Sequence, residues 1–145
     1  MAITSAICTS FKQELLVGTH NFTETTGNTF KIALFTSSAS LGASTTAYST
    51  SNEITNSSGT AYTAGGATLT SVTPTTDSTT AVCDFADVSY TSASFTANGA
   101  LIYNDTQSDK AVAVIAFGSD KTVTSGTFTI QFPTADATNA IIRLA

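Results

Sequence analysis

The sequence predicts an all-β antiparallel domain, a β-sandwich or jelly-roll-like fold, with one short helix near the N-terminus. Thr and Ser make up about a third of the 145 residues, and charged residues only 10%. After residue 29, apolar residues alternate with polar ones in short runs, and turn residues separate these runs. Thr is β-branched and fits a pleated surface, whereas the shortage of Lys and Glu leaves little material for exposed helix faces.

The length predicts one domain, 1–145, with a core of its own. Within it, we expect residues 1–20 to form a helical segment or arm and residues 29–145 to form the sandwich. The stretch 37–60 is rich in Ser, Thr, Ala and Gly and has little periodicity. We interpret it as a long surface loop, which in a compact domain is usually functional or mobile.

One segment has helical spacing. Ile7, Phe11 and Leu15 recur every four residues and share one face of a helix expected from about residue 4 to 17. A Thr or Ser near its start is expected to cap it, and Gly18 to end it in a left-handed conformation. The apolar face would pack either on the domain's own sheet or on a neighbouring subunit.

The strands are predicted from period-two alternation and from turn signals. The first strand is expected at 29–36, and 111–118 is apolar on both sides, as in a central strand covered on both faces. Asn98-Gly99 is a strong hairpin signal, and Ser119 begins a second predicted turn. The remaining strands are expected at 67–73 (ended by Pro74), 80–85, 88–90, 94–97, 100–104, 127–132 and 140–144.

Charge and composition argue against several classes of function. The net charge is −5, and a nucleic-acid surface needs clustered Lys and Arg. The N-terminus has no pattern of a signal peptide, and no apolar run is long enough for a membrane span. Cys8 and Cys83 are interpreted as reduced, buried side chains rather than as a disulfide or metal site. The basic residues are scattered: Lys12, Lys31, Lys110, Lys121 and Arg143.

The sequence contains no recognisable catalytic or cofactor-binding motif, so we predict no enzyme activity and no cofactor. His20 is the one histidine, has no nucleophile motif to serve, and is interpreted as a solvated turn residue. Asp84 and Asp87, and Asp105 and Asp109, leave a calcium site or a glycosidase pair open. The interpretation we prefer is that such carboxylates cap backbone amides, with no metal site.

Five blocks of this sequence together resemble a family of small virion structural proteins of tailed bacteriophages. The resemblance covers most of the chain, and its C-terminal block is the most specific part. It implies a virion component and carries over no active-site residue. The blocks are ICTSFKQELLVGTHNF, FKIALFTSSASL, AYTAGGATLT, GALIYND and AFGSDKTVTSGTFTIQFPTADATNAIIRLA.

The resemblance and the β-rich, charge-poor composition together predict a capsid decoration (cement) protein on the virion surface, made in the host cytoplasm. It would bridge major capsid protein subunits, and a homo-oligomer is expected, with a trimer favoured. The alternatives are a tail, neck or fibre-base protein, or a host-surface or carbohydrate-binding module that uses the loops between Tyr48 and Tyr62. The residues predicted to bind partners are Ile7, Phe11, Leu15, Leu41, Tyr48 and Ile54.

Overall fold

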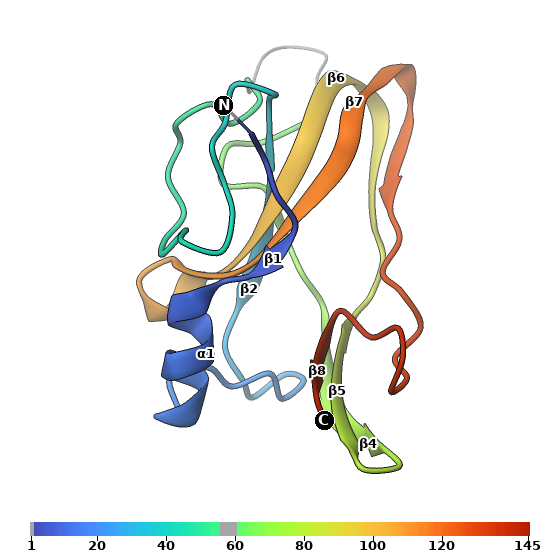
Figure 1. The fold of residues 1–145 in the computed structure, drawn as a ribbon. Helices are drawn as coiled ribbons and strands as arrows, with labels where there is room; N and C mark the ends of the chain where they lie inside the picture. The colour runs from blue at the N-terminus through green and yellow to red at the C-terminus, as the bar shows by residue number, and fades with distance from the viewer. Residues whose placement is uncertain (1, 56–60) are drawn as a thin grey trace.

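The computed structural model describes residues 2–55 and 61–145, so residues 56–60 of the predicted loop lie outside the described residues. It confirms the predicted fold class: an all-β, sandwich-like domain with one short helix (Figure 1). The elements in chain order are β1 (Ala6–Ile7), α1 (Thr9–Leu16), β2 (Phe30–Phe35), β3 (Ala67–Thr68), β4 (Ser71–Asp77), β5 (Thr80–Phe85), β6 (Val88–Asn104), the 3-10 helix η1 (Asp105–Gln107), β7 (Lys110–Ile130) and β8 (Ile142–Leu144).

Two antiparallel sheets make up the domain. The larger has the strand order β1-β7-β6-β2-β3, and the smaller has the order β4-β5-β8. Pro74, expected to end a strand, lies inside β4. β4 is an edge strand with a register shift between Val72 and Thr75, and an edge next to a bulge is where a sheet tolerates a residue without an N–H.

A long bent hairpin dominates the larger sheet. β6 and β7 have 17 and 21 residues, and Figure 1 shows both strands turning over at the top of the molecule. The turns predicted at Asn98-Gly99 and at Ser119 are therefore wrong, because both sites lie within these strands. A side chain at Gly99 would stand 2.7 Å from Cγ2 of Ile3 and 2.8 Å from the backbone oxygen of Ile115, so the glycine serves a bulge and a close approach.

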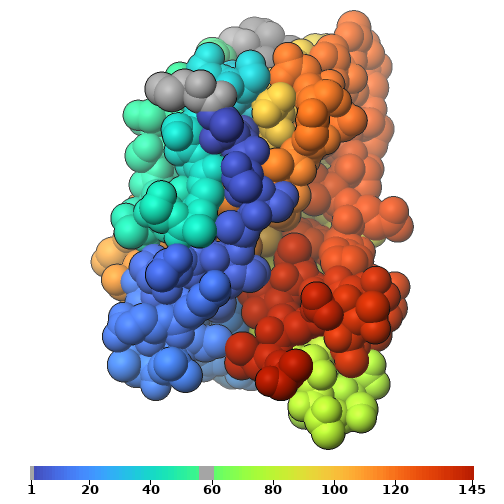
Figure 2. Space-filling view, viewed as in Figure 1, coloured from blue at the N-terminus to red at the C-terminus, as the bar shows by residue number. Residues whose placement is uncertain are grey.

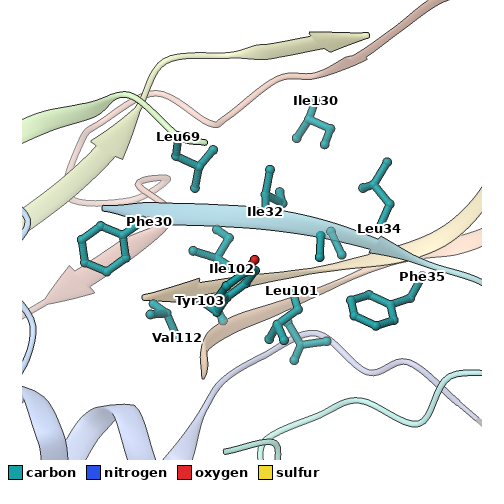
Figure 3. Packing of buried hydrophobic residues seen from close by; sticks show 14 of the residues in the cluster. Phe30, Ile32, Leu34, Phe35, Leu69, Leu101, Ile102, Tyr103, Val112 and Ile130 are labelled. Atoms are coloured by element: carbon teal, nitrogen blue, oxygen red, sulfur yellow. The ribbon is translucent and has the colours of Figure 1, made fainter. Parts of the chain in front are cut away.

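The core lies on both faces of the β2–β6 region. Figure 3 shows Ile32 and Leu34 on the same side as Leu69, and Phe35 and Leu101 on the opposite side. Five of the six residues of β2 are buried, so this strand is covered twice, as expected for a central strand of a packed domain.

The helix is shorter than predicted. Residues 6 and 7 pair with β7 in the register Ala6↔Val114, so they extend the sheet instead of the helix. Cys8 takes the N-cap position without a side-chain hydrogen bond, so the predicted Thr or Ser cap is wrong. The predicted end is confirmed, because Gly18 follows the helix with a φ of +78°.

The described residues of the predicted arm and of the predicted loop, 2–20 and 37–55, are tied to the larger sheet and to each other. Ile3 forms a parallel bridge with Leu41, and Phe35 an antiparallel bridge with Glu53. In Figure 2 the dark-blue N-terminal segment runs between the cyan-green segment and the orange part of β7. These segments are parts of the packed domain rather than free extensions of it.

Candidate functional site

The residues predicted to bind partners are largely used inside the domain. Phe11 is 1% exposed and Ile54 is 5% exposed, so the prediction that these two are docking residues is wrong: each fills the chain's own core. The other four are half-buried and pack against that core: Ile7, Leu15, Leu41 and Tyr48. The structure thus resolves the question left open by the helical pattern, since the Phe11 face packs on its own domain.

Glu53 holds the segment 37–55 in place. Its carboxylate accepts hydrogen bonds from the hydroxyls of Tyr48 (2.7 Å) and Tyr62 (2.5 Å) and from the backbone N–H of Gly65 (2.8 Å). Tyr62 is almost fully buried, and the ring of Tyr48 stacks on that of Tyr103 with centroids 4.5 Å apart. The ring of Tyr62 therefore has no open face for stacking a sugar, and one face of Tyr48 is taken by Tyr103, which argues against the carbohydrate site considered above.

These tyrosines are kept neutral by their surroundings. Burial, with the hydrogen bond to Glu53 as the next cause, raises the pKa of Tyr48 and of Tyr62 well above the ordinary value. Burial also raises the pKa of Tyr103. Because a neutral hydroxyl is needed to donate to Glu53, the cluster is built for protonated tyrosines.

A second polar network surrounds His20. The interpretation of this residue as a solvated turn histidine is wrong, because its side chain is 0% exposed. Its Nε2 lies 2.8 Å from Oε2 of Glu14, and its Nδ1 lies 2.9 Å from Nδ2 of Asn104. Lys110 donates to Oε1 of Glu14 at 3.2 Å. The network joins α1, the segment after it, the end of β6 and the start of β7.

The His20 network has the composition of a catalytic site but not the access that catalysis needs. Both ring nitrogens are engaged and the ring is sealed beneath Phe11 and Phe22, with centroids 4.8 Å and 6.5 Å away. Burial alone would raise the pKa of Glu14, but the hydrogen bonds from His20 and Lys110 outweigh it and hold this pKa below its ordinary value. A general base must reach a substrate proton, and His20 in this setting cannot.

The carboxylates considered for calcium or for glycoside cleavage have other uses. Asp87 accepts from the backbone N–H of Phe132, and Asp84 from that of Phe85. Among residues 2–55 and 61–145, no group of three His, Cys, Asp or Glu side chains could hold a metal ion. Both hydrogen bonds fit the prediction that these carboxylates cap backbone amides.

The two cysteines are free thiols. Cys8 is buried and Cys83 is half-buried. Burial raises the pKa of each thiol to about 11. At neutral pH such thiols are protonated and are poor nucleophiles.

One end of the molecule exposes aliphatic side chains near a groove. Leu16 is 88% exposed, Val17 67% and Leu144 57%. Leu144 lines a groove of about 450 Å³, which we call the end groove, and Leu16 and Val17 stand in the sequence between two other lining residues, Leu15 and Gly18. The apolar lining of the end groove comes from α1, the segment after it and the smaller sheet: Leu15, Phe22, Pro74, Val82, Ile142 and Leu144.

Sequence reasoning missed Leu16 and Val17. The run Leu15-Leu16-Val17 carried the signal, because three consecutive apolar residues spread over about 200° of a helix and cannot all face one core. Leu144 gave no such signal, since it continues the apolar pattern of the predicted last strand.

A second apolar groove, of about 490 Å³, lies between β7 and the segment that follows it. Phe117 and Phe128 line it and are half-buried, whereas Phe132 is 8% exposed. Phe132 therefore belongs to the core, whereas Phe117 and Phe128 pack against it with part of each side chain exposed.

No protein-family model, curated protein or solved structure matches this chain. The resemblance to phage virion proteins accordingly stays a prediction. In the described part of the chain, no helix is long and apolar enough to cross a membrane.

Proposed function

We propose that this chain is a non-enzymatic structural subunit of a tailed-phage virion, which decorates the capsid by binding neighbouring major capsid proteins. The observation that carries the proposal is the exposure of Leu16, Val17 and Leu144, of which Leu144 lines the end groove and the other two are flanked in the sequence by its lining residues Leu15 and Gly18. Exposed aliphatic side chains next to an apolar groove on a charge-poor surface are typical of a contact that another protein covers. The resemblance of the sequence to virion proteins supports the same assignment.

The chemistry of the described residues also favours a structural role. His20 has both ring nitrogens occupied and no exposed side-chain surface, and the two thiols are protonated at neutral pH. The polar networks around His20 and Glu53 connect segments of the chain to one another.

Binding through the end groove would leave the sandwich itself unchanged. A rigid module loses little conformational entropy on docking, so a modest apolar contact can be effective. Repeated contacts at symmetric positions on a capsid, or within a trimer of this chain, would raise the overall affinity further.

The first test is the number of copies in purified virions. A decoration protein is expected in hundreds of copies per particle, whereas a tail, neck or fibre-base protein is expected in a few to a few dozen. Quantitative gel staining against the major capsid protein separates the two. Absence of the chain from purified particles would overturn the virion assignment.

The second test addresses the surface. The double variant Leu16→Ser/Val17→Ser should bind capsids that lack this protein at least about tenfold more weakly than the wild type, since two buried aliphatic contacts are worth a few kcal/mol. The matched control is Val72→Ser, which removes an exposed aliphatic side chain, 42% exposed, from β4 instead of from the end of α1. Equal occupancy by both variants would show that docking uses another surface.

A further inference from the structure

We propose that Glu14, His20 and Asn104 form a latch that holds the end of α1 and the segment 18–28 in place only while His20 is neutral. The proposal concerns this chain alone and stands whether or not the virion assignment is correct. It rests on the directions of the hydrogen bonds in the network, which two backbone donors determine.

The first backbone donor fixes the amide of Asn104. The N–H of Gln107 donates to Oδ1 of Asn104 at 3.2 Å, so Nδ2 must be the atom that faces His20. The second backbone donor gives the same answer from the other side. The N–H of Asn21 donates to Oδ1 of Asn28, and this oxygen also accepts from Nδ2 of Asn104, both at 2.9 Å.

The tautomer of His20 follows from these directions. An amide Nδ2 can only donate, so Nδ1 of His20 accepts and carries no proton. Nε2 therefore carries the proton and donates to the carboxylate of Glu14 at 2.8 Å. The network is complete for a neutral imidazole with the proton on Nε2.

Protonation of His20 would break this arrangement. A proton on Nδ1 would face the N–H groups of Asn104 at 2.9 Å, donor against donor, with no water at a side chain that is 0% exposed. The amide of Asn104 could accept from His20 only by rotating, which removes its bonds to Gln107 and Asn28. Protonation is thus coupled to the loss of the bond from Asn104 to Asn28, which ties the segment 18–28 to the N-cap of η1.

Several elements supply the charged and polar groups of the network around His20. α1 supplies the Glu14 carboxylate, and β7 supplies Lys110, which binds the other oxygen of Glu14. The end of β6 and the segment before β2 supply the neutral amides of Asn104 and Asn28. The Glu14 side of the ring thus offers an acceptor to a protonated nitrogen, whereas the Asn104 side offers none.

The latch lies next to the end groove. Leu15, Gly18 and Phe22, which line the groove, lie on the two segments that the latch joins. Release of the segment 18–28 on protonation of His20 would alter the shape of this surface.

The test uses the one histidine of the full-length chain, so that nitrogen NMR of the imidazole needs no assignment. At pH 8 we expect the tautomer with the proton on Nε2. On titration to pH 5, hydrogen-exchange protection of the Gln107 and Asn21 amides should fall at least about tenfold as the imidazolium forms, while Ile102 in the core stays protected. The other tautomer at pH 8, or full protection of Gln107 beside a protonated ring, would overturn the proposal.

Two variants separate the latch from a merely structural role. Asn104→Asp supplies an acceptor for a protonated Nδ1 and keeps one for Gln107, so protection of Gln107 should then survive acidification. His20→Gln cannot be protonated, so protection in this variant should not follow the wild-type transition. Should Asn104→Asp fail to fold, the wild-type titration and His20→Gln still decide the question, and an unchanged pH dependence in His20→Gln would contradict the latch.

Discussion

Phe11 and Leu16 lie on the same short helix, but one is 1% exposed and the other 88%. Around Phe11 the apolar side chains are covered by aromatic rings of the chain's own core, with the ring of Phe22 5.9 Å away. Leu16 is exposed, and the residue before it, Leu15, lines the open end groove. The comparison between this sealed side and the open end shows that one amphipathic element can stabilise a domain with one face and offer a contact with another.

Among single substitutions, the largest loss of stability is expected on the sealed side, at Phe11. Phe11→Ala should lower the free energy of unfolding by about 3–5 kcal/mol, because it removes a buried aromatic side chain and leaves a cavity. Chemical denaturation measures the change. Gln13→Ala, at an exposed position of the same helix, is the control and should change stability by less than about 0.5 kcal/mol.

The same contrast predicts the result of truncation. If residues 1–17 were a free arm, their deletion would leave the β domain folded. Because Cys8 and Phe11 belong to the core, we expect the deletion to abolish the cooperative unfolding transition. A truncated chain that unfolds like the full-length protein would show that the helix is only attached to the domain.

The next prediction tests the close approach of the N-terminal segment to the bulge of β6 at Gly99. Gly99→Ala should cost about 1–3 kcal/mol, since the added carbon would meet the side chain of Ile3 and the backbone oxygen of Ile115 below 3 Å. Gly126→Ala is the matched control in the same hairpin, because its nearest neighbour would stand at 3.4 Å. Equal losses in thermal denaturation would show that the loss at Gly99 comes from strand flexibility instead.

Another prediction concerns the pH dependence of stability. Tyr62 is buried and its pKa is raised, so its stabilising contribution is complete below about pH 10, where unfolded tyrosine is neutral, and is lost as the pH rises further. One unit above that value the loss is about 1.4 kcal/mol for one tyrosine that stays neutral in the folded state. Tyrosinate absorbance from the buried rings should appear together with unfolding, and its appearance in the folded protein would contradict the Glu53 cluster.

The sequence predicted best where local signals and tertiary packing agree. β5 has the predicted bounds 80–85, and β2 differs from the prediction by one residue at each end. The sequence predicts several short strands in place of the long strands β6 and β7, because Asn98-Gly99 and the polar stretch at Ser119 have the residue types of turns. The strands continue through both sites because β6 and β7 pair with each other along their length, and β-bulges accommodate the residues that interrupt the register.

The functional sites were harder to predict, because the spacing of apolar residues does not show whether the domain's own core or another protein covers an apolar face. The shared face of Ile7, Phe11 and Leu15 was recognised, but the choice between core and partner needed the position of the sheet. His20 was assigned to solvent because its neighbours Glu14 and Asn104 are brought to it by the fold, Asn104 from 84 positions further along the chain.

The smallest expected effect is at the open end, and it completes the comparison. Leu16→Ser should change the free energy of unfolding by less than about 0.5 kcal/mol, because an 88% exposed side chain has little burial to lose. Leu15→Ser, one residue earlier, should cost clearly more, since Leu15 packs against the core. Urea denaturation of the two variants measures both values. A large loss in Leu16→Ser would mean that this side chain is covered in the protein in solution, and the open end would then already be an interface between copies of the chain.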